Sequence, residues 1–265
     1  MTSYVSTDID GPIAVVTLNR ADKHNAFDDA LIADLAATFK ALDTNGAVRV
    51  VVLSAAGKSF SAGADLNWMK RMAGYTEEEN FRDASALAGL MRTLHGLSKP
   101  TIARVQGAAY GGGVGLIACC DMAVGSHDAA FALSEVRIGL IPAAISPYVI
   151  AAIGERTAHR YFLTGERFDA AEGYRLGLLS ELMPTEDAMD EKIEELVNAI
   201  LVSSPTAIGE AKQLIAAVAN RPIDGRLATD TAQRIARVRC SADGKEGIGA
   251  FLDKRKPSWI AGDKE

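Results

Sequence analysis

The first hundred or so residues alternate short runs of β-branched residues with longer segments that have helical spacing. The short runs are rich in Val and Ile, as strands buried on both faces are, and the segments between them repeat their apolar residues at a helical period. The pattern predicts a strand, a helix, a strand, a helix and a strand, in that order, at residues 13–18, 26–42, 48–53, 77–97 and 101–105. This order predicts an α/β fold with a largely buried sheet.

Helical spacing dominates the chain after about Ile145. Segments with a period near 3.6 residues lie at positions 188–201, 206–219 and 227–238. We find no low-complexity linker and no internal repeat between the two halves. We therefore expect an α/β core in residues 1–200 and a helical C-terminal region in residues 201–265.

Charge and cysteine content exclude several classes of function. A formal net charge of −6 over 265 residues provides no basic field for phosphate backbones, so we expect no nucleic-acid partner. No apolar run reaches membrane-spanning length, and the N-terminal residues lack the pattern of a signal peptide. The three cysteines form no CxxC pair, which favours a reducing compartment and argues against a metal site. We expect a cytoplasmic protein without a membrane anchor.

Two short matches to nucleotide-binding motifs fail on their spacing. The sequence GKS at 57–59 ends like a phosphate-binding P-loop, but the earlier glycine of that motif would fall at Val52. A dinucleotide fingerprint started at Gly111 meets Leu116 where its last glycine belongs. Neither a nucleotide nor a dinucleotide cofactor is therefore expected.

Two segments rich in small residues stand where a strand turns into a helix. They are SFSAGADLNWM at 59–69 and VQGAAYGGGVGLIACCD at 105–121, and within the second the stretch 111–120 predicts a short buried helix. Small residues let a ligand approach the backbone, and a following helix points its free amides toward that ligand. Close packing of helix on strand would also select glycine, so either segment alone leaves both interpretations open. Their joint occurrence favours a ligand site.

Two converging amides of this kind would form an oxyanion hole. Such a site suits a thioester whose carbonyl becomes enolate-like when a proton leaves or joins the adjacent carbon. Loss of one donor of this kind typically costs about 2.7 to 4 kcal/mol of activation free energy. The chemistry indicated by the two segments is therefore proton transfer next to an acyl thioester.

Seven stretches, in order along nearly the whole chain, resemble the enoyl-CoA hydratase/isomerase, or crotonase, family. They are RADKHNAF (20–27), SFSAGADL (59–66), QGAAYGGGVGL (106–116), CDMAVGS (120–126), FALSEVRIGLIP (131–142), FLTGERFDAAEGYRLGLL (162–179) and FLDKRKPSW (251–259). The resemblance implies a superhelix of strand-strand-helix turns followed by a helical trimerisation region. It also implies a homo-oligomer, a trimer or a dimer of trimers.

The same resemblance assigns roles to individual residues. It implies that the amides of Ala64 and Gly112 form the oxyanion hole and that Glu135 is the catalytic acid/base. Positions that match family contacts with the acyl-CoA substrate are Lys23, Ala26, Ala62, Asp65, Leu66, Phe251 and Lys254, the last two reaching CoA from a neighbouring subunit. Coenzyme A is part of the substrate, so no separate cofactor and no metal is implied.

One family position departs from the usual pattern. Typical hydratases of the family carry two catalytic glutamates, and the first of these positions is Gly115 here, whereas the second is Glu135. With a single carboxylate, Glu135 must act as base and acid in sequence. Its apolar neighbourhood, FALSEV, predicts a raised pKa that would help it alternate between the two states.

The substrate class follows from resemblance within the family. The stretches SAGADLNWMKRM, AAYGGGVGLIACCD and GLIPAAISPYVIAAIGER resemble methylglutaconyl-CoA hydratases of leucine catabolism and isohexenylglutaconyl-CoA hydratase-like enzymes that act on terpenoid-derived thioesters. The hydroxyls of Ser146 and Tyr148 are candidates to hold water or a substrate carboxylate. We therefore expect a hydro-lyase that reversibly hydrates 3-methylglutaconyl-CoA or a related branched glutaconyl-CoA.

Two alternatives remain open from the sequence. A Δ3-Δ2 enoyl-CoA isomerase also needs only one carboxylate, because it moves one proton between two carbons. A scaffold that binds CoA thioesters with little catalysis would also tolerate Gly115 in place of a glutamate.

Overall fold

The computed structural model describes residues 4–260, which divide into two compact units. The first unit comprises residues up to 97 together with 101–194, and the second comprises 98–100 together with the residues from 195 onward. The division falls within helix α8 (Glu186–Leu201). Each unit is described separately below.

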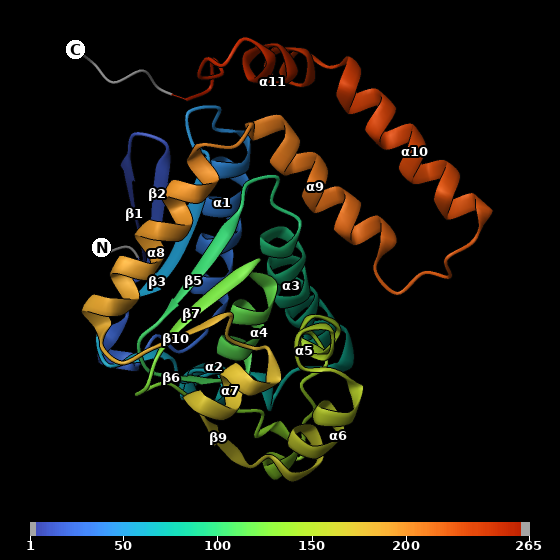
Figure 1. The fold of residues 1–265 in the computed structure, drawn as a ribbon. Coiled ribbons are helices and arrows are strands. Elements are labelled where there is room, and N and C mark those ends of the chain that lie inside the picture. The colour runs from blue at the N-terminus through green and yellow to red at the C-terminus, as the bar shows by residue number, and fades with distance from the viewer. Residues whose placement is uncertain (1–3, 261–265) are drawn as a thin grey trace. The chain divides into compact units, whose positions relative to one another are not determined.

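A six-stranded sheet forms the centre of the first unit (Figure 1). Its order is β1 (Val5–Asp10), β2 (Ile13–Leu18), β3 (Val50–Ala55), β5 (Thr101–Val105), β7 (Met122–Ser126) and β10 (Glu181–Met183). β1 and β2 form an antiparallel hairpin, and the pairings from β2 to β10 are parallel. Five of the six residues of β3 are buried, as expected for a strand of a parallel sheet covered on both faces. The predicted α/β class is confirmed.

A smaller sheet carries the segments that the sequence analysis singled out. Its order is β4 (Ser59–Ser61), β6 (Ala108–Tyr110), β8 (Ala130–Ala132) and β9 (Arg167–Asp169). The first three strands are parallel, and β9 is antiparallel to β8. Because the carboxyl ends of parallel strands lie at one edge of a sheet, the residues that follow β4, β6 and β8 come together there.

Several helices of the first unit begin at side chains that accept hydrogen bonds from their free amides. The Asp28 carboxylate accepts a hydrogen bond from the Leu31 N–H and starts α1 (Asp29–Thr44), three residues later than the spacing predicted. Thr76 and Glu79 form a reciprocal capping box at the start of α3 (Glu77–His95). α1 and α3 pack against each other, and α3 also contacts α4 (Gly112–Cys119), the predicted short buried helix.

Beyond the sheets, the first unit is mostly helical, as the spacing after Ile145 predicts. These helices are α5 (Ser146–Ile153), α6 (Glu155–Thr164) and α7 (Ala170–Leu176). In chain order, the short strand β9 lies between α6 and α7, and β10 follows α7. The helical spacing of the sequence indicates neither strand. Among residues 4–260, no helix is both long enough and apolar enough to cross a bilayer.

The second unit consists of the end of α8 and three further helices. They are α9 (Pro205–Val218), α10 (Gly225–Cys240) and α11 (Ala242–Leu252), each started by an N-cap side chain. All three contact one another, and an ion pair of 2.6 Å joins Arg237 of α10 to Glu210 of α9. The predicted helical C-terminal region is therefore present.

Candidate active site

The carboxyl ends of three parallel strands bring the predicted catalytic groups to one edge of the small sheet. β4 leads to Ala64, β6 leads to Gly112, and β8 leads to Glu135. The chain is short between each strand and its residue, so sheet order alone makes the three groups neighbours. This edge is the candidate active site.

The Ala64 amide is held in place by a bridge between two extended segments. Phe27 donates its N–H to the Gly63 carbonyl, and its own carbonyl accepts from the Asp65 N–H, at 2.7 Å in both cases. These bonds turn the Ala64 N–H away from the bridge, and no acceptor within residues 4–260 takes it. Gly63 has φ +88, and a Cβ there would lie 3.3 Å from the Tyr110 carbonyl oxygen. The turn that presents the Ala64 amide therefore requires glycine.

The Gly112 amide belongs to the first turn of α4, where N–H groups have no intrahelical acceptor. The preceding Gly111 has φ +49 and donates its N–H to the Ala132 carbonyl at 3.0 Å. A Cβ on Gly112 would lie 3.2 Å from the Phe27 ring. The glycine run thus allows close packing and leaves the Gly112 amide free of an intrahelical acceptor, and the ligand site stays a prediction.

Glu135 begins a 3₁₀ helix, η2 (Glu135–Ile138), and its carboxyl lies against the start of α4. Its Oε1 is 2.9 Å from the position that a Cβ on Gly111 would take. Its Oε2 is buried and accepts no hydrogen bond from the described residues. Burial raises the pKa of Glu135, and a hydrogen bond from its own backbone offsets part of that rise. Burying a carboxylate oxygen without a hydrogen-bond partner lowers the stability of the folded protein, which points to a functional role.

Gly115 faces an apolar side chain at the position where the family usually carries its first glutamate. A Cβ there would lie 2.8 Å from Ile145 Cβ and closer still to Ile145 Cγ2, with Met91 Cε at 3.3 Å. These atoms fill the space beside the helix. Glu135 is consequently the carboxylate that the three strand ends bring to the Ala64 and Gly112 amides.

Ser146 and Tyr148, the candidate hydroxyls, belong to the first turn of α5. The Ser146 hydroxyl donates to the Ala143 carbonyl at 2.8 Å. The Tyr148 ring packs on His95 with centroids 5.1 Å apart, and burial followed by the nearby Cys119 thiol raises its pKa. Cys119 ends α4, about 10 Å along the helix from Gly112 at 1.5 Å per residue. The tyrosine therefore lies toward the far end of α4.

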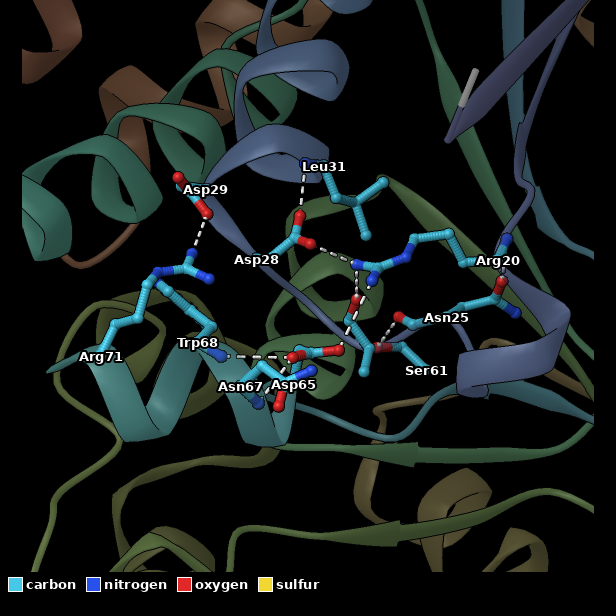
Figure 2. A network of polar contacts seen from close by, with 11 residues as sticks. Arg20, Asn25, Asp28, Asp29, Leu31, Ser61, Asp65, Asn67, Trp68 and Arg71 are labelled. Carbon is cyan, nitrogen blue, oxygen red and sulfur yellow. Dashed lines mark hydrogen bonds and ion pairs between the residues drawn. The ribbon is translucent and has the colours of Figure 1, made fainter. Parts of the chain in front are cut away.

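A buried polar network supports the segment that contains Ala64 (Figure 2). The Arg20 guanidinium lies 2.7 Å from Asp28 and 3.4 Å from Asp65, and it donates to the Ala26 carbonyl at 3.0 Å. Asp65 in turn accepts N–H bonds from Asn67 and Trp68 at the start of α2 (Leu66–Met72). Burial opposes ionisation of Asp65, but these two amides and the Arg20 charge outweigh it, and its pKa is lowered.

Asn25 and Ser61 complete this network. The Asn25 side-chain amide donates to the carbonyls of Ala56 and Ser59 at 2.9 Å, and the Ser61 hydroxyl donates to the Asn25 carbonyl at the same distance. Asn25 has φ +53, a conformation that asparagine tolerates better than most residues. Sequence reasoning did not single out Arg20, Asn25 or Ser61, although all three lie in the matched stretches 20–27 and 59–66.

The residues predicted to line the CoA-thioester channel alternate in exposure. Ala62, Ala64 and Leu66 are exposed, with Leu66 at 73 %, whereas Asp65 is buried and caps α2. Lys23 is exposed, and Ala26 is buried. Ala62 and Ala64 belong to the segment between β4 and α2, and Leu66 is the first residue of α2.

Phe251 and Lys254 lie in the second unit, so their positions are described only within it. Phe251 is 83 % exposed near the end of α11, and Lys254 follows that helix with φ +54. Among residues 4–260, no group of three or more His, Cys, Asp and Glu side chains is arranged to hold a metal ion.

Comparisons with known proteins place this chain in a family. The family described as Enoyl-CoA hydratase/isomerase matches residues 8–262. An enoyl-CoA hydratase structure from Shewanella pealeana is 44% identical, with a TM-score of 0.94, and the match covers 97% of this chain and 96% of that one.

Two curated relatives carry more specific names. The 2,3-dehydroadipyl-CoA hydratase of Escherichia coli is 30% identical, with 93% of this chain and 94% of the relative covered. The mevalonyl-coenzyme A hydratase of Aspergillus fumigatus is 33% identical, with 93% and 91% covered. The chain belongs to the enoyl-CoA hydratase/isomerase family.

Proposed function

We propose that the protein is an enoyl-CoA hydratase that reversibly adds water across the α,β double bond of an acyl-CoA thioester, with Glu135 as its acid/base. The observation that carries this proposal is the carboxyl of Glu135 lying against Gly111, with a buried oxygen that no described residue satisfies. The free amides of Ala64 and of the first turn of α4 stand beside it on the same sheet edge.

In the dehydration direction the ionised Glu135 removes the proton on the α-carbon. The electron pair of the broken C–H bond moves into the thioester, and the Ala64 and Gly112 amides stabilise the enolate oxygen. The enolate then expels the β-hydroxyl, which takes the proton from the Glu135 carboxyl and leaves as water. Hydration is the reverse of these steps, in which Glu135 first removes a proton from water.

The environment of Glu135 suits this double use. Burial raises its pKa toward the working pH, so the protonated and ionised forms lie closer in free energy than those of an exposed glutamate. The contact between Gly115 and Ile145 leaves no space there for a second carboxylate. A substrate whose hydroxyl leaves readily would suit a single acid/base.

The substrate we propose is 3-methylglutaconyl-CoA or a related branched glutaconyl-CoA. Its hydrated form carries the hydroxyl on a tertiary carbon, from which departure is comparatively easy. The relative named mevalonyl-coenzyme A hydratase supports this class, because a mevalonyl group also has a tertiary hydroxyl. The resemblance of the stretches around Ala64, Gly112 and Ile145 to methylglutaconyl-CoA hydratases is the second support.

We further propose that the protein works as a trimer or a dimer of trimers. The second unit exposes large apolar side chains on α11, including Phe251 at 83 % and Leu252 at 72 %. Apolar side chains this exposed favour a covering partner. In the family-like assembly, Phe251 and Lys254 of one subunit would contact the CoA bound to its neighbour.

The test is turnover of 3-methylglutaconyl-CoA and crotonyl-CoA, followed by loss of the conjugated enoyl absorbance, with Glu135→Gln beside the wild type. We expect hydration of the branched substrate by the wild type and none by the variant, while CoA-ester binding survives. Wild-type protein that binds the thioesters but hydrates neither would overturn the hydratase assignment and favour the scaffold.

One observation also favours a positional isomerase. A site with Ile145 where a second carboxylate would stand can still move one proton between two carbons. Incubation of a 3-enoyl thioester in ¹⁸O-labelled water separates the two functions. An isomerase yields an unlabelled 2-enoyl product. A hydratase without isomerase activity leaves the 3-enoyl thioester unchanged and yields a labelled 3-hydroxy product only when it is given the 2-enoyl thioester.

A further inference from the structure

Gly111, the N-cap of α4, and Gly115 within the helix lie about one turn apart, and each contacts a side chain of the segment 135–145. The Gly115 N–H donates to the Gly111 carbonyl at 3.2 Å, so the two positions are separated by about 6 Å along the helix axis. Glu135 Oε1 lies against Gly111, and the Ile145 side chain lies against Gly115. Both ends of the segment therefore rest on the same helix.

Ile145 is a fixed point for this segment and for the helix that follows. Its side chain is 2 % exposed, and its carbonyl accepts N–H bonds of 3.1 Å from both Tyr148 and Val149 in the first turn of α5. The gap beside Gly115 is too small for any added Cβ while Ile145 occupies it. The Ile145 side chain therefore fits closely against Gly115.

The other end of the segment is tied to Glu135 through its backbone. The Glu135 carbonyl accepts the Leu140 N–H at 3.0 Å, and Gly139, with φ +78, closes the turn. The Glu135 side chain is supported by a hydrogen bond from its own backbone, and its Oε2 accepts none from residues 4–260. Packing of the segment on α4 must therefore orient the carboxyl.

We propose that Ile145 is a positioning residue for Glu135, because its side chain fills the space beside Gly115 and so fixes segment 135–145 on α4 with the carboxyl over Gly111. This inference rests on the proposed role of Glu135 in catalysis. It concerns the orientation of the carboxyl and not the binding of the CoA portion. Substitution of Ile145 should therefore lower kcat and leave KM nearly unchanged.

Variants that shorten Ile145 or restore its contact with Gly115 test this positioning role. We expect Ile145→Ala to lower kcat by about tenfold with KM changed less than about twofold, and Ile145→Val to recover most of kcat. Gly115→Ala should also lower kcat, because its methyl group displaces Ile145. The double variant Gly115→Ala/Ile145→Ala should have a higher kcat than Gly115→Ala alone, since the new methyl group then has room.

A matched contact far from the site supplies the control. A Cβ on Gly125 of β7 would lie 2.5 Å from Cδ1 of Leu179, which is 1 % exposed. Leu179→Ala creates a comparable cavity in the core, so it should lower the melting temperature and leave kcat within about twofold of wild type. Ile145→Val and the double variant keep the test readable if Ile145→Ala does not fold.

The outcomes separate this inference from the proposed function. Wild-type turnover that Glu135→Gln abolishes, combined with an unchanged kcat in Ile145→Ala, would overturn the positioning role and leave the hydratase in place. A fall in kcat that Leu179→Ala reproduces would overturn it equally, because the effect would then be general loss of packing. Absence of wild-type turnover would overturn both.

Discussion

The guanidinium of Arg20 lies 3.4 Å from the carboxylate of Asp65, the residue that follows the Ala64 amide. The same guanidinium lies 2.7 Å from Asp28, which follows Phe27. Phe27 and Ala64 form the bridge that orients the amide, so one buried cation holds both sides of that bridge (Figure 2). Loss of the Arg20 charge should therefore affect both the stability of the protein and the orientation of the Ala64 amide.

Arg20→Met should destabilise the protein strongly and lower kcat as well. Removal of one partner leaves Asp28 and Asp65 as buried charges, which typically costs about 3–5 kcal/mol of unfolding free energy. Denaturant unfolding and steady-state kinetics measure the two effects. Arg104→Met is the control, because Arg104 pairs with the exposed side chains of Glu186 and Asp190, and it should cost about 1 kcal/mol or less with kcat unchanged. An Arg20→Met variant as stable as wild type would contradict this account.

Much of this fold could be predicted from periodicity. The buried strands β2, β3 and β5 and the helices α3 and α4 have strongly patterned sequences, and they lie where the patterns indicate. β1 could not be found in this way, because five of its six residues are exposed and pair only with β2. The three-residue strands β6 and β9 are too short for any period to appear, so the pairing of the small sheet emerges only in three dimensions.

The site could be predicted only in part, because local patterns are visible in the sequence and long-range contacts are not. Glycine-rich turns are visible in a linear sequence and mark the two segments, whereas the resemblance to the family assigns Ala64, Gly112 and Glu135. The supports are long-range. Arg20 meets Asp65 across 45 residues, and Gly115 meets Ile145 across a sheet edge and a loop. No local pattern encodes such contacts.

Gly63→Ala should damage the oxyanion hole. Its φ of +88 disfavours any side chain, and the new methyl group would press on the Tyr110 carbonyl at 3.3 Å, which shifts the Ala64 amide. Full loss of one such donor costs about 2.7 to 4 kcal/mol of activation free energy, so we expect kcat to fall by about one hundredfold. The variant should still bind CoA esters.

Gly154→Ala is the matched control for backbone strain. Gly154 has φ +78 with nothing within 4 Å of an added Cβ, and it lies between α5 and α6. The control should lower the melting temperature through strain alone and leave kcat near the wild-type value. Equal loss of kcat in the two variants would show that strain, and not the amide, causes the effect.

The activity should have an acidic limb set by Glu135. The ionised carboxylate is the base in either direction, and burial raises its pKa above the ordinary value of 4.5. As the pH falls through this raised pKa, the fraction of ionised enzyme and kcat/KM should fall together. A pH profile of kcat/KM measures the limb, which we expect above pH 4.5. A limb at or below that value would contradict the burial of the catalytic carboxylate.

Glu135→Gln should abolish turnover and at the same time stabilise the protein at neutral pH. The folded-state pKa is raised above the unfolded value, so the folded protein binds more protons in that interval, and stability falls as the pH rises through it. Glutamine has the same shape and no charge to desolvate. We expect a gain of about 1 kcal/mol at neutral pH, shrinking below pH 4.5, where the carboxyl is protonated in both states.

Glu172→Gln should show the opposite sign, which makes it the control. Hydrogen bonding to Arg175 lowers the pKa of Glu172 to about 2, so its ionised form contributes stability that is present above the unfolded pKa and lost as the pH falls. Guanidinium unfolding of both variants at neutral and acidic pH measures the two signs side by side. Neutralising a carboxylate that has a structural role lowers the stability of the protein. Neutralising a buried carboxylate that has a catalytic role raises it. If Glu135→Gln were destabilised at neutral pH as Glu172→Gln is, Glu135 would belong to the structural class.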